Sequence, residues 1–213
     1  LAHGRPCFKL AVDGIGPLDW TWRESPLVQN SYQLGEVYDL RRPEDKVAKK
    51  AVAVTGPKGK IVPARAPTIG PLLVEGTRGE SHWLKKGEVQ VIDFELNCTG
   101  VYNFKLDGTG LKSGDRIEII YGERLNADGS VNPLTQAAGQ IKRAGMGGPG
   151  APDVAMQKDV VIADGRQQND FYFNNSVTWH VARYVEIRGC RTLLKPDDAV
   201  RMPIGSRVEP VEP

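Results

Sequence analysis

Cysteine, aromatic residues and an excess of either charge are all scarce in this sequence. Its 213 residues include three cysteines, Cys7, Cys98 and Cys190, without a Cys-x-x-Cys pair, so the strong pattern of a zinc site is missing. The 28 basic and 26 acidic residues leave a formal charge of +2 without a basic block, which argues against nucleic acid as a partner. No apolar run is long enough to span a membrane, and the first residues do not form a signal peptide.

The most informative stretch runs from Val177 to Gly189 and alternates in hydrophobicity with a period of two. Apolar residues occupy one set of alternate positions, Val177, Trp179, Val181, Val185 and Ile187. The other set holds Thr178, His180, Tyr184 and Glu186. This pattern predicts a half-buried strand with its apolar set toward the core. Because the stretch exceeds the usual strand length, we expect a bend near residues 180–182.

Residues 87–189 read as short strands joined by turns. The expected strands before the last one are Val89–Leu96, Val101–Leu106, Arg116–Tyr121, Lys158–Ala163 and Asp170–Phe173. Asp-Gly or Ser-Gly pairs at positions 107, 113, 128 and 164 are typical of turns with positive φ. The segment Leu134–Arg143 is the best helical candidate, and the Gly/Pro-rich residues 144–153 predict a surface loop. The fold class that follows is all-β, an antiparallel β-sandwich.

The parts of the chain before residue 71 are less regular. Residues 1–24 suggest edge strands with a Gly/Pro connection, giving a short irregular N-terminal β region. Between Arg41 and Gly70, so many prolines and glycines occur that an extended connection is expected, with a domain boundary near Pro71. For Cys98 and Cys190 we expect free thiols, with a disulfide between them as the alternative.

Four segments resemble, in chain order, the bacterial α-L-rhamnosidase family. Gly35-Glu-Val-Tyr-Asp39 and the following Leu-Arg are similar to its Gly-Glu-x-Tyr-Asp-Ala-Arg motif. Residues 92–106 resemble its Asp-Phe-Gly-Gln-Asn strand and partner, and residues 117–129 its Gly-Glu-x-Leu-x-x-Asp-Gly hairpin. Trp179 to Ile187 resembles its His-Gly-Phe-Arg-Tyr-Val-Glu-Val strand. The resemblance covers most of residues 20 to 190.

The resemblance implies a jelly-roll or concanavalin-like sandwich over residues 71–195. Residues 1–70 would be the end of a preceding β-sandwich domain and a linker, and residues 196–213 a C-terminal tail. Members of the family are inverting hydrolases whose catalytic residues lie on a separate (α/α) barrel. The resemblance therefore implies no catalytic residue in this chain. This chain would be an inactive accessory region for polysaccharide degradation whose partner is the catalytic domain of the same parent polypeptide. Family analogy favours a periplasmic or secreted location.

Sugar binding is the alternative function, as a module for rhamnose-containing carbohydrate. The candidate residues combine aromatic rings with hydroxyl-binding groups: Asn30, Tyr32, Glu36, Tyr38, Asp39, Arg41 and Trp83. Glu36 and Asp39 are weak calcium candidates, and no other cofactor or metal is expected. For Glu36, Asp39 and Arg41, however, the favoured interpretation is that they join two domains by charged hydrogen bonds. We expect His180 to be a hydrogen-bonded structural residue and Trp83 to cover the core edge. No motif supports a third possibility, a complete small enzyme with its own carboxylate pair.

Overall fold

The computed structural model describes residues 21–42, 49–50, 67, 69–72, 75–137, 154–166, 170–175 and 178–206. The strands at its start are β1 (Thr21–Trp22), β2 (Leu27–Ser31), β3 (Gly35–Asp39), β4 (Lys49–Lys50), β5 (Ile69–Pro71) and β6 (Thr77–Arg78). The longer strands that follow are β7 (Glu80–Lys85), β8 (Val89–Asp107), β9 (Arg116–Gly122), β10 (Lys158–Ile162), β11 (Asp170–Asn174), β12 (His180–Arg188) and β13 (Ala199–Ser206). Among all the described residues, the only helical segments are two short 3₁₀ turns, η1 (Pro133–Gln136) and η2 (Pro196–Asp198).

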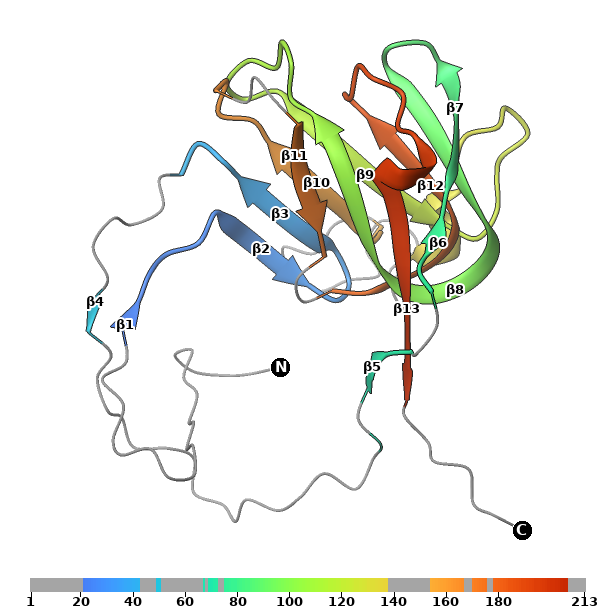
Figure 1. The fold of residues 1–213 in the computed structure, drawn as a ribbon, viewed down its shortest axis with the longest axis horizontal. Helices are drawn as coiled ribbons and strands as arrows, with labels where there is room; N and C mark the ends of the chain where they lie inside the picture. Colours follow the sequence, from blue (N-terminus) through green and yellow to red (C-terminus); the bar gives the residue numbers. More distant parts are fainter. Residues whose placement is uncertain are drawn as a thin grey trace.

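Eleven strands form one curled sheet, and β1 pairs only with β4 (Figure 1). The order along the sheet is β2-β3-β10-β9-β12-β8-β13-β5, with β7 and β11 also on β8 and β6 on β13. All these pairs are antiparallel except β3 with β10. The all-β fold and the sandwich expected from the sequence are confirmed. No helix in the described residues is long and apolar enough to cross a membrane.

Strand β8 carries the chain from one layer of the sandwich to the other. It is 19 residues long and unites the two strands that the sequence placed at 89–96 and 101–106. In its first half, residues 89–93 pair with β7 and β12; in its second half, residues 98–100 pair with β12 and residues 100–107 pair with β11 and β13. The bend between the halves lies at Glu95, which has a φ of 63°. Residues 97–100, which lie between the two expected strands, are therefore extended strand, and the bend lies before them.

Strand β12 has an irregularity directly opposite this bend. Ala182 pairs with Cys98 whereas Tyr184 pairs with Asp93, so four residues of β8 face Arg183 alone. At this irregularity Arg183 forms an ion pair with Asp93 on β8, with 2.8 Å between Nη2 and Oδ2. The hydrogen bond from this guanidinium lowers the pKa of Asp93. The bend expected near residues 180–182 is thus a bulge one residue further on.

The bulge reverses which face of β12 is buried. After it, Val185 and Ile187 are fully buried, as the alternation predicted. Before it, Thr178 and His180 are buried whereas Trp179 is 37% exposed. The prediction that Trp179 faces the core is therefore wrong, because the register between β12 and β8 shifts by three residues at Arg183, and an odd shift exchanges the two faces of a strand.

The core lies between the two layers and is rich in aromatic contacts. Tyr102 contacts Phe94 edge-on and Tyr121 at a tilt, with ring centroids 5.3 and 5.1 Å apart. Arg201 on β13 is also buried, and its Nη1 donates to the carbonyl oxygen of Ala182 at 3.1 Å and to that of Leu96. Those two carbonyls lie at the bulge and the bend, so Arg201 supplies donors where the regular ladder is interrupted.

The sheet extends past both ends of the range 71–195. Residues 27–39, placed before the expected boundary, form β2 and β3 and join β10, and residues 199–206, placed in the tail, form β13. Whether residues 1–70 include the end of another domain stays a prediction. Of the helix expected at Leu134–Arg143, the structure describes residues 134–137, and these contain only the end of the short 3₁₀ turn η1. The loop expected at 144–153 and the residue Cys7 lie outside the described residues. Cys98 and Cys190 are free thiols, so the disulfide alternative is wrong.

Candidate functional site

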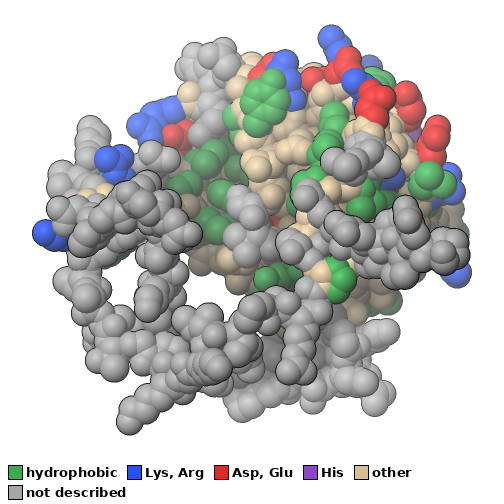
Figure 2. Space-filling view, turned by 60° about the horizontal axis from the view of Figure 1, so that its bottom comes forward, with side chains coloured by type: hydrophobic (Ala, Val, Ile, Leu, Met, Phe, Trp, Pro, Cys, Tyr) green, Lys and Arg blue, Asp and Glu red, His purple; other side chains and the backbone are tan. Residues whose placement is uncertain are grey.

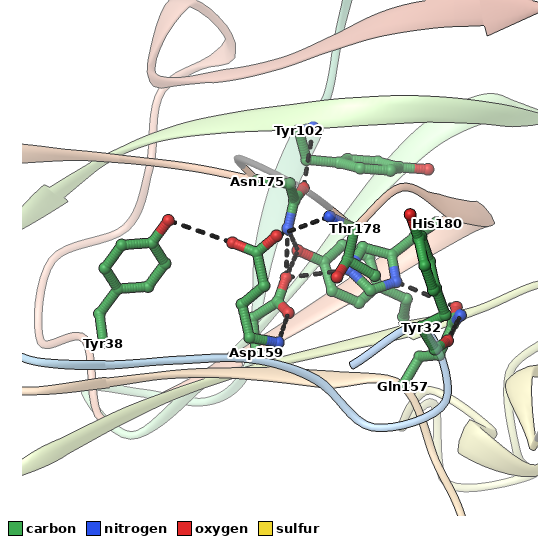
Figure 3. A network of polar contacts seen from close by, with 10 residues as sticks. Tyr32, Tyr38, Tyr102, Gln157, Asp159, Asn175, Thr178 and His180 are labelled. Carbon is green, nitrogen blue, oxygen red and sulfur yellow. Dashed lines mark hydrogen bonds and ion pairs between the residues drawn. The ribbon is translucent and has the colours of Figure 1, made fainter. Parts of the chain in front are cut away.

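A cluster of buried polar side chains lies beneath the start of β12 (Figure 3). At its centre the Asp159 carboxylate accepts the backbone N–H of Glu36 and the hydroxyl of Tyr121, both at 2.7 Å. It also accepts the side-chain amide of Asn175 and lies 3.0 Å from Nε2 of His180. Asp159, Tyr121 and His180 have no exposed surface. This cluster joins β3, β9, β10 and β12 through polar contacts inside the sheet.

His180 is a structural member of this cluster, as expected. Its ring stacks on Tyr121 with centroids 3.7 Å apart and planes 14° apart. Its Nδ1 lies 3.1 Å from Oε1 of Gln157, so both ring nitrogens face oxygen atoms. Burial and the neighbouring Asp159 carboxylate together raise the pKa of Tyr121 well above its usual value. The Tyr121 hydroxyl therefore stays protonated and donates to Asp159.

Glu36, a candidate for sugar and calcium binding, is directed into the protein. It has no exposed surface; its Oε1 accepts the backbone N–H of Thr178 at 2.6 Å and its Oε2 accepts the hydroxyl of Tyr38 at 3.1 Å. These bonds tie β3 to the segment that leads into β12. Two of the seven candidates are thereby brought together, in an internal contact.

Asp39 and Arg41 also meet each other. Two hydrogen bonds, each of 2.8 Å, join Nε and Nη2 of Arg41 to the two carboxylate oxygens of Asp39. The hydrogen bond from Arg41 is the main cause that lowers the pKa of Asp39 to about 2. Glu36 and Asp39 are three positions apart, so a strand directs them to opposite faces. The described residues contain no group of three His, Cys, Asp or Glu side chains arranged to hold a metal.

The remaining candidates are dispersed. Asn30 is exposed on the edge strand β2, and Tyr32, 57% exposed, lies in the turn between β2 and β3. Trp83 is half-buried on β7, and four strands lie between β3 and β7 in the sheet. Trp83 is thus separated from the others, whereas the ring centroid of Tyr32 lies 5.7 Å from that of Trp179.

A hollow of about 270 Å³ opens beside Trp179, at the surface above the buried cluster. Its described lining consists of Glu123, Thr135, Gln136, Ala137, Gln157, Trp179 and Val181. None of these lining residues is one of the sugar-site candidates. The candidate Tyr32 lies next to the hollow, because its ring contacts that of Trp179. The sequence did not predict the hollow, because the alternation over residues 177–189 assigned Trp179 and Val181 to the core. The length of this stretch indicated an irregularity in the strand but not its position.

The two sides of the hollow differ in character. Trp179 and Val181 share the outward face of the chain entering β12 and form an apolar wall. The polar part of the lining includes Glu123, which follows β9, and Thr135 and Gln136, which belong to η1. The Gln136 amide donates to Oε1 of Glu123 at 3.2 Å, and Thr135 Oγ1 accepts the backbone N–H of Glu123 at 2.9 Å. These bonds join the residues of the polar wall to one another.

Comparisons with known proteins find one matching family model and several solved structures with a similar fold. Residues 84–204 match the family model of the bacterial alpha-L-rhamnosidase concanavalin-like domain. The alpha-L-rhamnosidase from Dictyoglumus thermophilum is 25% identical with a TM-score of 0.64, over 87% of this chain and 20% of that one. The Streptomyces avermitilis alpha-L-rhamnosidase complexed with L-rhamnose is 18% identical with a TM-score of 0.62, over 86% and 16%.

A third structure gives the same picture. The alpha-L-rhamnosidase from Aspergillus terreus is 20% identical with a TM-score of 0.61, over 87% of this chain and 20% of that one. This chain therefore spans a fifth or less of the length of these relatives. A comparison with curated proteins finds no match.

Proposed function

The chain belongs to the bacterial α-L-rhamnosidase concanavalin-like domain family, and on this basis we propose that it is a non-catalytic accessory region of a rhamnosidase-like glycoside hydrolase. Its task would be to pack against the catalytic (α/α) barrel of the same parent polypeptide and to shape access to it. The observation that carries the proposal is the family match over residues 84–204, in a chain that spans a fifth or less of rhamnosidases with this fold.

The arrangement of carboxyl groups supports a role without catalysis. Glycoside hydrolysis requires two carboxyl groups that face each other across the sugar. The buried carboxylates of Glu36, Asp159 and Glu186 are held by protein donors; for Glu186 these are the Val131 N–H at 2.9 Å and the Arg188 guanidinium. Among the described residues lining the hollow, Glu123 is the one carboxyl group. A catalytic pair is therefore not assembled from these side chains.

Activity measurements test the proposal directly. The purified chain is incubated with a chromogenic α-L-rhamnoside, and its rate is compared with that of the longer parent polypeptide, with and without residues 21–206. We expect background rates for the chain alone, activity for the longer polypeptide, and loss of activity or stability when the sandwich is deleted. Turnover by the chain alone, abolished by a single carboxylate substitution within it, would contradict the accessory role.

Carbohydrate binding is a second candidate function, and one observation favours it. Tyr32 and Trp179 form an exposed aromatic pair at the margin of a partly polar hollow, a combination typical of sites that bind sugars. The two functions are compatible, because an accessory region can hold the substrate of its neighbouring catalytic domain.

A further inference from the structure

We propose that the hollow between Trp179 and Glu123 binds a 6-deoxyhexopyranose such as L-rhamnose. The class of sugar rests on the proposed function, whereas the position of the site rests on the geometry of these walls. The proposed site differs from the sequence-predicted segment from Asn30 to Arg41, which contributes only Tyr32 at its margin.

The apolar wall is the first part of the argument. The bulge at Arg183 reverses the faces of β12, so Thr178 and His180 point inward while Trp179 and Val181 line a solvent-filled hollow. An indole ring that is 37% exposed offers a flat apolar surface for the C–H face of a pyranose. Val181 beside it gives an apolar contact of the size of a methyl group. A 6-deoxy sugar, with its methyl group beside a C–H face, complements this pair.

The polar wall is the second part. Glu123 and Gln136 face the hollow with a carboxylate and an amide, which can bind neighbouring hydroxyl groups. Both side chains are held in place, since Gln136 donates to Glu123 and the backbone N–H of Glu123 donates to Thr135. Because the donors and acceptors are pre-arranged, a sugar would lose little free energy in ordering them. Hydroxyl groups of a sugar in the hollow would bind these two side chains.

The buried cluster fixes the position of the aromatic pair. Glu36 accepts the backbone N–H of Thr178 at 2.6 Å, and Thr178 directly precedes Trp179. Gln157 lines the hollow, contacts His180 through Oε1 and donates through Nε2 to the carbonyl oxygen of Tyr32. The two rings are thus anchored to the same internal network, which gives the hollow a defined shape without a ligand.

Titration of the full chain with L-rhamnose, followed by amide chemical shifts in NMR spectra, tests the proposal. We expect saturable shifts at Thr178–Val181, Glu123 and Gln136, and Trp179→Ala should weaken binding about tenfold or more. Tyr172→Ala is the matched control, because Tyr172 on β11 is 76% exposed and does not line the hollow, so its affinity should stay unchanged. L-mannose, which carries a hydroxyl where L-rhamnose has only a methyl group, should bind about fourfold more weakly or worse.

Three outcomes would overturn the assignment: no shifts at about 50 mM L-rhamnose, shifts confined to Asn30–Arg41, or equal affinity of Trp179→Ala and Tyr172→Ala. The circular dichroism spectrum of each variant establishes that it is folded; if Trp179→Ala is not, Trp179→Leu replaces it. Failure of this proposal and failure of the accessory role are separable. Turnover of a chromogenic rhamnoside by the chain refutes the accessory role alone, whereas absent binding without turnover refutes the sugar site alone.

Discussion

Replacement of Asp159 by alanine is the sharpest test of the buried cluster. The carboxylate is fully buried and takes contacts from four donors: the Glu36 N–H, the Tyr121 hydroxyl, the Asn175 amide and His180 Nε2. An alanine side chain removes this acceptor from all four, although the Asn175 amide keeps a second contact with the Tyr121 hydroxyl at 3.4 Å. Each stranded buried donor costs about 1–3 kcal/mol, so the other three alone give a loss of about 3 kcal/mol or more in the free energy of unfolding.

That loss is large on the scale of a whole domain, because single domains unfold with about 5–15 kcal/mol. Urea denaturation followed by circular dichroism measures it as a lower midpoint with an unchanged slope. Asp159→Asn should cost less, about 2–3 kcal/mol, since Oδ1 can still accept the Glu36 N–H while the new amide opposes the Asn175 amide. Asp170→Ala is the matched control; its carboxylate is exposed and pairs with Lys105 at the surface.

The reasoning is refuted if Asp159→Ala unfolds at the same urea concentration as Asp170→Ala. Such a result would mean that water or neighbouring side chains replace the carboxylate at almost no cost. An intermediate result, with Asp159→Ala and Asp159→Asn equally destabilised, would locate the whole effect in the Oδ2 contacts rather than in the backbone N–H of Glu36.

Two further predictions concern the strand that carries Glu36. Gly35→Ala should destabilise the fold by about 3 kcal/mol or more, because φ is +83° and a Cβ would lie 2.4 Å from the carbonyl oxygen of Lys158; Gly87→Ala, with φ +75° and nothing within 4 Å, should lose only about 1 kcal/mol in the same urea assay. Asp39→Asn should remove a pH-dependent part of the stability: the folded-state pKa of Asp39 is lowered from 3.8 to about 2, so its contribution is complete above pH 4 and disappears as the pH falls toward 2. Urea midpoints at pH 6 and pH 2 should therefore differ between wild type and Asp39→Asn at the higher pH and converge at the lower one, and a constant difference would contradict the assignment.

Much of the sheet could be predicted from local pattern. The strands expected at 116–121, 158–163 and 170–173 are β9, β10 and β11 to within a residue at each end. Alternation and β-branched content are local properties, so a sequence records them directly. Gly114, Gly129 and Gly165 occupy positive φ after Ser, Asp and Asp, as the turn signals predicted. The prediction is wrong for Gly108, since positive φ occurs two residues later, at Gly110. The second half of β12 faces the core as expected, because no irregularity separates Val185 from Ile187.

The candidate site could be predicted only in part. Tyr32 was identified and lies beside the hollow, but Glu36, chosen for its chemistry, is buried in the protein. A carboxylate in a strand can meet solvent or a buried donor, and the difference depends on the backbone N–H of Thr178, 142 residues away in the sequence. No local pattern contains that information. Trp179 was missed for the same reason, since its exposure depends on pairing between β12 and β8.

Local patterns in the sequence predicted that this chain forms a β-sandwich, placed β9, β10 and β11 to within a residue at each end, and carried the family resemblance. Only the tertiary structure decided which faces those strands present. The bend at Glu95 in β8 and the bulge at Arg183 in β12 oppose each other, and their combined offset exchanges the inner and outer residues of one half of β12. Side chains alternate with a period of two, so an odd shift in the register between two strands exchanges their faces. Here the shift turned Trp179 outward and His180 inward.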